Sequence, residues 1–279
     1  MVRPGGDDIE PPLRLNGECR KAVFKLQEDQ PRAERPQTPQ TPQTPQAQIR
    51  FPRRAPRFRD RTHAGQELAA ELQHILDPHE AIILAIPPDG VPVAASAASS
   101  LNVPLDLVIP GRIVAPGTTD STLAVVTPDR TLLVNRSLVS RMGLSDEDVE
   151  RLSIPAWAEV QRAQQAYRRG RPYPDLRGRT VVIVDESLST GYTMIAAAVS
   201  VRKMEPARIV VAVPVCHVEG AERVRAYADE LLSLEMSNEG DFVGASYYLH
   251  LPPLTEREII WILDHFWAEH PPQGYSETF

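Results

Sequence analysis

Two adjacent acids followed by small and hydroxyl-bearing residues form the most informative segment of the chain. Asp185 and Glu186 come directly after a bare apolar run at residues 181–184, and the residues behind them lead into an expected helix. The backbone N–H groups of such a turn and the dipole of the helix start bind phosphate well. Carboxylates just before the turn suit the vicinal hydroxyls of a sugar. The segment therefore predicts a ribose-5-phosphate site, and its small or hydroxyl-bearing turn residues are Ser187, Ser189, Thr190, Gly191 and Thr193.

Two other phosphate-binding patterns do not fit this segment. The dinucleotide fingerprint G-x-G-x-x-G needs three glycines, and only Gly191 is present. A Walker A loop needs Gly-Lys-Ser/Thr, which is also missing. A purely structural interpretation stays open for each residue alone, because an acid after a strand is a common helix cap and a Ser/Thr/Gly turn is common. The combination, after a buried strand and before a helix, favours the binding site.

The elements around this segment alternate between strand and helix patterns. The apolar runs that predict strands lie at residues 81–86, 105–109, 180–184, 208–213 and 231–234. The helical patterns lie at residues 62–76, 91–101, 193–203, 219–227 and 255–265. Such alternation predicts an α/β fold with a parallel-sheet core and helices on both faces. Ligands bind such sheets beyond the carboxyl ends of the strands, which is where Asp185 and Glu186 lie.

Two further elements interrupt this alternation. Residues 121–126 and 130–135, separated by Thr-Pro-Asp, predict a hairpin. Residues 145–169 predict a long helix that begins at Ser145, with an interruption at Pro155 left open.

The first 56 residues differ in kind from the rest. Residues 36–46 repeat Pro-Gln-Thr without an apolar side chain, so burial there cannot offset the entropy of ordering. We expect residues 1–56 to be a largely disordered tail with at most a short helix around residues 20–27. Residues 57–267 form the expected domain, and residues 268–279 form a C-terminal tail.

Composition narrows the classes of protein. The chain has 279 residues, of which 42% are hydrophobic and 24% charged, as in ordinary globular proteins. No apolar run reaches the ~20 residues of a membrane span, and no secretory signal is visible, so we expect a cytoplasmic protein without a membrane partner. Two cysteines, Cys19 and Cys216, are too few for a disulfide framework or a cysteine-based metal site.

The charge is unevenly distributed. The net charge is −7, and it divides into 12 Lys/Arg against 8 Asp/Glu in residues 1–60 and 18 against 29 in the remainder. An acidic body argues against nucleic-acid binding by the folded part. The arginine-rich run at residues 50–61 is typical of a solvated linker, and contact with an acidic partner or RNA stays the alternative.

Residues 181–194 resemble the motif by which type I phosphoribosyltransferases bind 5-phosphoribosyl-1-diphosphate (PRPP): an apolar strand, two acids, small residues and Thr-Gly-x-Thr. The resemblance extends over residues 58–265 to a bacterial and archaeal group of predicted, uncharacterised phosphoribosyltransferases. The similar segments are Phe-Arg-Asp-Arg-Thr-His-Ala-Gly at residues 58–65, and residues 84–94, 212–215 and 241–248. The resemblance implies a phosphoribosyltransferase-like core with a small irregular hood.

The resemblance implies roles for individual residues. Asp185 and Glu186 would contact the ribose hydroxyls and favour positive charge at the ring during catalysis. The residues around the 5-phosphate would be Ser187, Leu188, Ser189, Thr190, Gly191, Tyr192 and Thr193. Mg²⁺ would be held mainly through PRPP, so no residue is predicted as a metal ligand. The implied reaction transfers phosphoribosyl from PRPP to a nitrogenous base and releases diphosphate.

This chain departs from the family pattern in two places that would meet the diphosphate. The family usually has Pro-Arg-Gly-Gly after the first core strand, where this chain has Pro87-Pro88-Asp89-Gly90. Pro88 has no N–H to donate and Asp89 adds negative charge beside an anion, although Asp89 and Gly90 still occupy the binding positions. Arg112 stands where the family offers Arg-Lys, and we expect a flexible loop there to bring it over the leaving group. A surface arginine is the alternative.

These departures leave two functions open. The first is an enzyme of nucleotide salvage or related metabolism. The second is a non-catalytic protein that binds PRPP or a nucleotide through the ribose-5-phosphate pocket and acts as a regulator. The sequence names neither the acceptor base nor the oligomeric state, and a homodimer is one form that stays open. His63 and His74 fit structural roles better than a metal site, and one of Tyr247 and Tyr248 fits the core while the other is a candidate to stack on a base.

Overall fold

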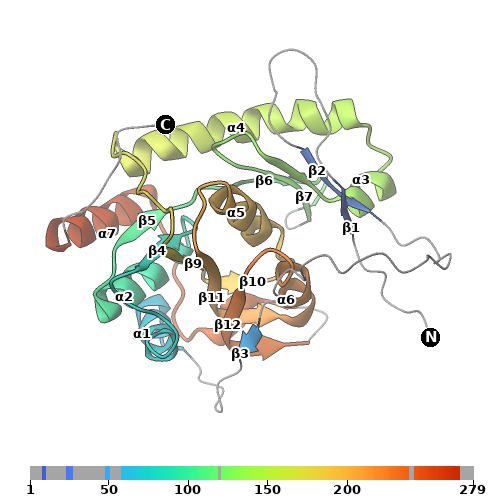
Figure 1. The fold of residues 1–279 in the computed structure, drawn as a ribbon. Helices are drawn as coiled ribbons and strands as arrows, with labels where there is room; N and C mark the ends of the chain where they lie inside the picture. The colour runs from blue at the N-terminus through green and yellow to red at the C-terminus, as the bar shows by residue number, and fades with distance from the viewer. Residues whose placement is uncertain are drawn as a thin grey trace, which may run out of the picture.

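The chain is built on two sheets (Figure 1). The structure is a computed structural model that describes residues 58–118, 121–238 and 242–270, together with the backbone of three short strands, Asp8–Glu10 (β1), Val23–Gln27 (β2) and Gln48–Arg50 (β3). The larger sheet has the order β3-β12-β11-β9-β4-β5, with β10 beside β11, and every pair in it is parallel. Its further strands are Ala81–Ala85 (β4), Leu105–Leu107 (β5), Thr180–Val184 (β9), Ser187–Leu188 (β10), Arg208–His217 (β11) and Glu230–Ser237 (β12). The predicted α/β fold with a parallel core is confirmed.

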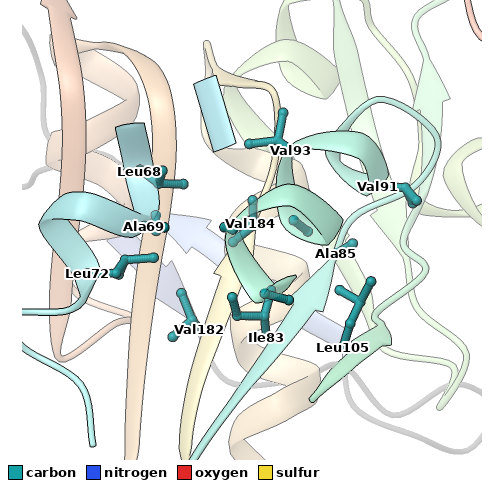
Figure 2. Close-up of a cluster of buried hydrophobic side chains, with 14 of the residues drawn as sticks. Leu68, Ala69, Leu72, Ile83, Ala85, Val91, Val93, Leu105, Val182 and Val184 are labelled. Carbon is teal, nitrogen blue, oxygen red and sulfur yellow. The ribbon is translucent and has the colours of Figure 1, made fainter. Parts of the chain in front are cut away.

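Helices cover both faces of this sheet, which explains why its central strands β4 and β9 are nearly continuous apolar runs. Alternate residues of β9 belong to different cores, since Val182 and Val184 pack in one cluster while Val181 and Ile183 pack in the other. The first cluster, part of which Figure 2 shows, lies against Arg61–Leu72 (α1), Gly90–Leu101 (α2) and Glu256–Glu269 (α7). The second lies against Tyr192–Arg202 (α5) and Val218–Val224 (α6).

The connections leave the sheet in opposite directions between β4 and β9. From β4 the chain passes through α2 to β5 at one edge, whereas from β9 it passes through α5 to β11 on the other side. The loops after β4 and β9 therefore diverge, and a crevice opens between them at the carboxyl ends of the strands. Ligands of open α/β sheets bind at such a switch point.

The second sheet forms the hood, which stands above the carboxyl ends of the core strands (Figure 1). Its order is β1-β2-β8-β7-β6, with the strands Gly111–Val114 (β6), Thr122–Val126 (β7) and Leu132–Val134 (β8). The predicted hairpin is confirmed as the antiparallel pair of β7 and β8. The helices Arg136–Arg141 (α3) and Asp146–Arg168 (α4) pack on one face, and α5 packs on Val125 and Leu133 at the other. The hood, which we expected to be irregular, is thus built on a sheet.

Helix α4 runs without interruption through Pro155. It begins as predicted at Ser145, whose side chain accepts from the backbone N–H of Asp148 while the Asp148 carboxylate accepts from the backbone N–H of Ser145. Pro155 is exposed, and the apolar side chains of Val149 and Val160 on either side of it are buried against the hood sheet. Tertiary packing on both sides offsets the loss of one helical hydrogen bond.

The N-terminal segment differs from expectation at one point that the structure describes. Residues 23–27 form strand β2, which pairs with β8, in place of the short helix expected around residues 20–27. Valine and phenylalanine at the start of this segment favour strands, and the hood sheet offers them an edge. Strands β1 and β3 also fall within the expected tail at residues 1–56, and its other residues, with residues 271–279, lie outside the described residues. None of the described helices has the length and apolar character needed to cross a membrane.

Candidate active site

A cavity of about 600 Å³ occupies the crevice between the loops after β4 and β9. The core contributes the segment after β9, the loop after β4 and a segment that ends at Gly244, and the hood contributes β6 and β7. The residues that line it are Ile86, Pro87, Pro88, Asp89, Pro110, Arg112, Thr122, Asp185, Glu186, Ser187, Leu188, Ser189, Thr190, Gly191, Thr193, Met194, Phe242, Val243 and Gly244. Ten of the twelve residues predicted for the site are therefore brought together. Gly90 and Tyr192 are the exceptions.

The turn between β9 and α5 is held from outside the cavity by α6. A Cβ atom on Gly220 would lie 2.0 Å from the carbonyl oxygen of Ser189, so only glycine allows the start of α6 to approach the turn this closely. The guanidinium of Arg223 donates to the carbonyl oxygen of Thr190 at 3.2 Å. Ser189 and Thr190 are exposed on the cavity side. The turn thus lines the cavity on one side, while α6 packs against the Ser189 carbonyl and binds the Thr190 carbonyl on the other.

Replacing Gly220 with alanine is expected to weaken ribose-5-phosphate binding by displacing this turn. The added Cβ cannot fit without moving the Ser189 carbonyl, and such overpacking costs about 1–3 kcal/mol. Thermal unfolding and calorimetric titration with ribose-5-phosphate measure the two effects. Gly170→Ala is the control, because a Cβ there meets nothing within 4 Å although its φ of +82° strains it. Equal ribose-5-phosphate affinity in both variants would contradict the role of α6.

Asp185 and Glu186 lie at the end of β9, and Asp89 adds a third carboxyl group to the same cavity. The pKa of Asp185 is raised to about 8, chiefly by burial. The backbone N–H of Glu186, which donates to Asp185 Oδ1 at 2.8 Å, and Arg112 lower this pKa, whereas the charges of Asp89 and Glu186 raise it. Burial also raises the pKa of Glu186, while the guanidinium of Arg61 lowers it. Three carboxyl groups therefore lie in one cavity with few cationic side chains beside them. Such a cavity suits a ligand that brings or develops positive charge.

Arg61 is the functional residue that the sequence reasoning missed. It begins α1 and is only 8% exposed at its side chain. Its Nε donates to Glu186 Oε2 at 2.5 Å and its Nη2 to Asp89 Oδ1 at 2.9 Å. Tyr248 supports the same acid from another side, because its hydroxyl donates to the backbone carbonyl oxygen of Glu186 at 2.8 Å. The Phe-Arg-Asp-Arg segment at residues 58–61 was the available signal, but its partners lie 28 and 125 residues away.

Arg112 reaches the cavity from a strand and not from a flexible loop. It lies in β6, where it is paired with Val125 of β7, and it is close enough to Asp185 to lower the pKa of that carboxyl. The expectation of a loop at this position is wrong. The loop was expected from the family resemblance, whereas residues 112–114 alternate between exposed and buried as an edge strand does.

Gly90 and Tyr192 lie behind the lining of the cavity. A Cβ on Gly90 would lie 2.7 Å from the Val184 carbonyl oxygen, so the glycine lets α2 begin directly against the end of β9. Tyr192 is buried in the core beneath α5. Asp89 precedes α2 but makes no side-chain capping hydrogen bond, and its carboxylate is paired with Arg61 instead. The negative charge that the sequence placed beside the diphosphate is therefore partly compensated.

The described residues offer no cluster of three or more His, Cys, Asp or Glu side chains placed to hold a metal by themselves. Asp89, Asp185 and Glu186 nevertheless give the cavity an excess of negative charge, which suits a cation that arrives with oxygen ligands of its own. This fits Mg²⁺ bound chiefly by a phosphorylated substrate.

A model of the phosphoribosyl transferase domain matches residues 59–249, which include every part of this cavity. The chain belongs to the phosphoribosyltransferase family. A provisionally assigned phosphoribosyl transferase of Mycobacterium tuberculosis, found in two strains, is 30% identical over 207 residues, which are 74% of this chain and 46% of that protein. The chain thus spans about half the length of these curated relatives. The crystal structure of the protein TT1426 from Thermus thermophilus is similar with a TM-score of 0.62 and 34% identity, and the match covers 75% of this chain and 99% of that one.

In this member of the phosphoribosyltransferase family, Asp185→Asn is expected to raise stability at alkaline pH. The pKa of Asp185 is raised from 3.8 to about 8, so between these values the folded protein keeps a proton that the unfolded chain has lost. Its contribution to stability is present below pH 4 and is lost as the pH rises through 8. The melting temperature of the variant minus that of the wild type should therefore increase from pH 5 to pH 9, by about 2–4 °C for each 1 kcal/mol. A constant difference across this range would contradict the raised pKa.

Proposed function

We propose that this protein transfers the phosphoribosyl group of PRPP to a nitrogenous base and releases diphosphate. The observation that carries the proposal is the meeting of two acids, the turn at residues 187–193 and Arg112 in one cavity at the switch point of the sheet. The acids lie one residue before the turn, so a ribose and its 5-phosphate fit along one continuous segment. Arg112 of β6 and Thr122 of β7 line the same cavity, and the second substrate would bind on this side of the ribose.

The mechanism depends on positioning and charge more than on covalent chemistry by the protein. The bond between C1 of the ribose and the diphosphate oxygen breaks, a bond from C1 to the base nitrogen forms, and the base gives up its proton. Positive charge develops at the ribose ring, where the carboxylate of Glu186 stabilises it and where that charge favours loss of the proton that Asp185 holds in the free protein. Arg112 stabilises the negative charge on the leaving diphosphate. Mg²⁺ bound to PRPP would neutralise part of that charge.

A non-catalytic regulator that binds PRPP or a nucleotide is the second candidate. The loop after β4 favours it, because Pro88 lacks a backbone donor and Asp89 is acidic. The ion pair between Asp89 and Arg61 weakens this argument, since it offsets the charge of the loop. The catalytic proposal is therefore the better supported of the two.

Diphosphate release separates the two functions. The protein is incubated with PRPP, Mg²⁺ and a mixture of purine, pyrimidine and pyridine bases, and diphosphate and new nucleotide are measured together. The enzyme should release diphosphate only when a base is present, in equal amount to the nucleotide formed, and the variant Asp185→Asn with Glu186→Gln should not. Calorimetric binding of PRPP without turnover for any base would reject the enzyme and support the regulator.

A further inference from the structure

The guanidinium of Arg61 joins three segments that surround the cavity. Nε donates to Glu186 after β9, Nη2 donates to Asp89 after β4, and Nη1 donates to the carbonyl oxygen of Pro252 at 2.7 Å. Glu186 and Asp89 lie on the two sides of the switch point, and both line the cavity. Arg61 itself does not line it. It therefore reaches the ligand site only through the two carboxylates that it binds.

A comparison with a second buried arginine shows what is particular to Arg61. Arg168 pairs with Asp106, and their side chains are 5% and 1% exposed. That pair belongs to the interior between α4 and β5, and neither residue lines the cavity. Both arginines satisfy a buried carboxylate, and removing either one leaves a buried charge without its partner. Of the two arginines, only Arg61 binds carboxylates that line the cavity.

We propose that Arg61 is a positioning residue that holds Glu186 against the ribose and supplies, from α1, the positive charge that the loop after β4 lacks. The proposal rests on the proposed function, because it assigns Glu186 to the ribose and Asp89 to the diphosphate side of the site. The acidic loop and Arg61 then act as a pair. Asp89 is tolerated beside an anion because its charge is bound by Arg61, and Arg61 is held in place by the Pro252 carbonyl oxygen and by Glu186.

The charged groups that face Glu186 determine how the site responds to pH. They are Arg61 from α1, Asp89 from the loop before α2, and the neighbouring Asp185, while the Tyr248 hydroxyl binds the Glu186 backbone. Burial and Asp89 raise the pKa of Glu186, and Arg61 lowers it. Loss of Arg61 should therefore raise the pKa of Glu186. As the pH is lowered, ligand binding that needs the ionised carboxylate of Glu186 would then be lost at a higher pH than in the wild type.

The test compares Arg61→Gln with Arg168→Gln in the full chain. Both substitutions remove one buried guanidinium, and both should lower the melting temperature. Calorimetric titration of the folded fraction should show at least a tenfold weaker affinity for ribose-5-phosphate and for Mg²⁺–PRPP in Arg61→Gln, and unchanged affinity in Arg168→Gln. The acid limb of ribose-5-phosphate binding should shift to higher pH in Arg61→Gln alone, and Arg61→Lys should restore part of the affinity.

Arg61→Lys keeps the proposal testable if Arg61→Gln is poorly folded, because it keeps the charge but not the branched guanidinium, and it should still lose more ribose-5-phosphate affinity than Arg168→Lys. Asp89→Asn removes a half-exposed partner of Arg61, and combined with Arg61→Gln it should recover PRPP affinity but not ribose-5-phosphate affinity, because only the diphosphate meets Asp89. Equal losses in Arg61→Gln and Arg168→Gln, or no recovery in the double variant, would overturn the positioning role. A wild type that binds both ligands but releases no diphosphate contradicts the proposed catalysis and leaves the binding test of Arg61 valid. A wild type that binds neither ligand overturns both.

Discussion

Replacing Asp185 and Glu186 together with alanine is expected to reduce ribose-5-phosphate affinity at least about tenfold, since a hydrogen bond to a charged group contributes about 1.5–3 kcal/mol. Both acids line the cavity at the end of β9, and no other carboxylate of the described lining except Asp89 is available to replace them. Calorimetry of the folded variant with ribose-5-phosphate measures the loss. Unchanged affinity would reject the assignment of both residues to the ribose.

The double variant needs a control for stability because Arg61 loses its partner. With Glu186 truncated, Nε of Arg61 stays buried without its acceptor, and breaking a buried ion pair costs about 3–5 kcal/mol. Asp185→Asn with Glu186→Gln keeps the shapes and tests the charge alone. Asp129→Ala is a matched control, because Asp129 binds Lys203 at 2.7 Å between hood and α5 and does not line the cavity. It should lower the melting temperature and leave the affinity unchanged.

The part of the site that lies on one continuous segment could be predicted from the sequence. A strand buried on both faces gives an unbroken apolar run, and that run placed Asp185 and Glu186 at the carboxyl end of β9. The turn behind them follows from the same segment, so its position needed no knowledge of distant contacts. The parallel core and most of its helices could be predicted for the same reason, because their periodic patterns are local.

The contacts between distant segments could not be predicted in this way. Arg61 meets Glu186 because α1 and β9 pack in one core, and nothing near either residue signals the pairing. The hood strand β6 was missed because a half-buried edge strand of four residues has too few apolar positions to be distinguished from a loop. Strand β2 forms against β8, so its conformation depends on a partner more than one hundred residues later.

Restoring the family pattern in the loop after β4, with Pro88→Arg and Asp89→Gly, is expected to raise PRPP affinity and leave ribose-5-phosphate affinity nearly constant. The substitution adds a cation and removes a carboxylate where the diphosphate lies. Asp89 makes no side-chain capping hydrogen bond to α2, so its loss removes no cap. It also frees Nη2 of Arg61, so that Glu186 is the one carboxylate of the original two that still offsets its charge.

The ratio of the two affinities decides between the interpretations of this loop. Calorimetry with Mg²⁺–PRPP and with ribose-5-phosphate gives the ratio for the wild type, for each single variant and for the double variant. If Asp89 opposes the diphosphate, Asp89→Gly alone should already increase the ratio, and Pro88→Arg should increase it further. A wild type that prefers PRPP by several orders of magnitude, together with a double variant that is no better, would mean that Arg112 and the backbone of the cavity hold the diphosphate without help from this loop. The acidic loop would then give no support to a regulatory role, and the result would favour the catalytic proposal.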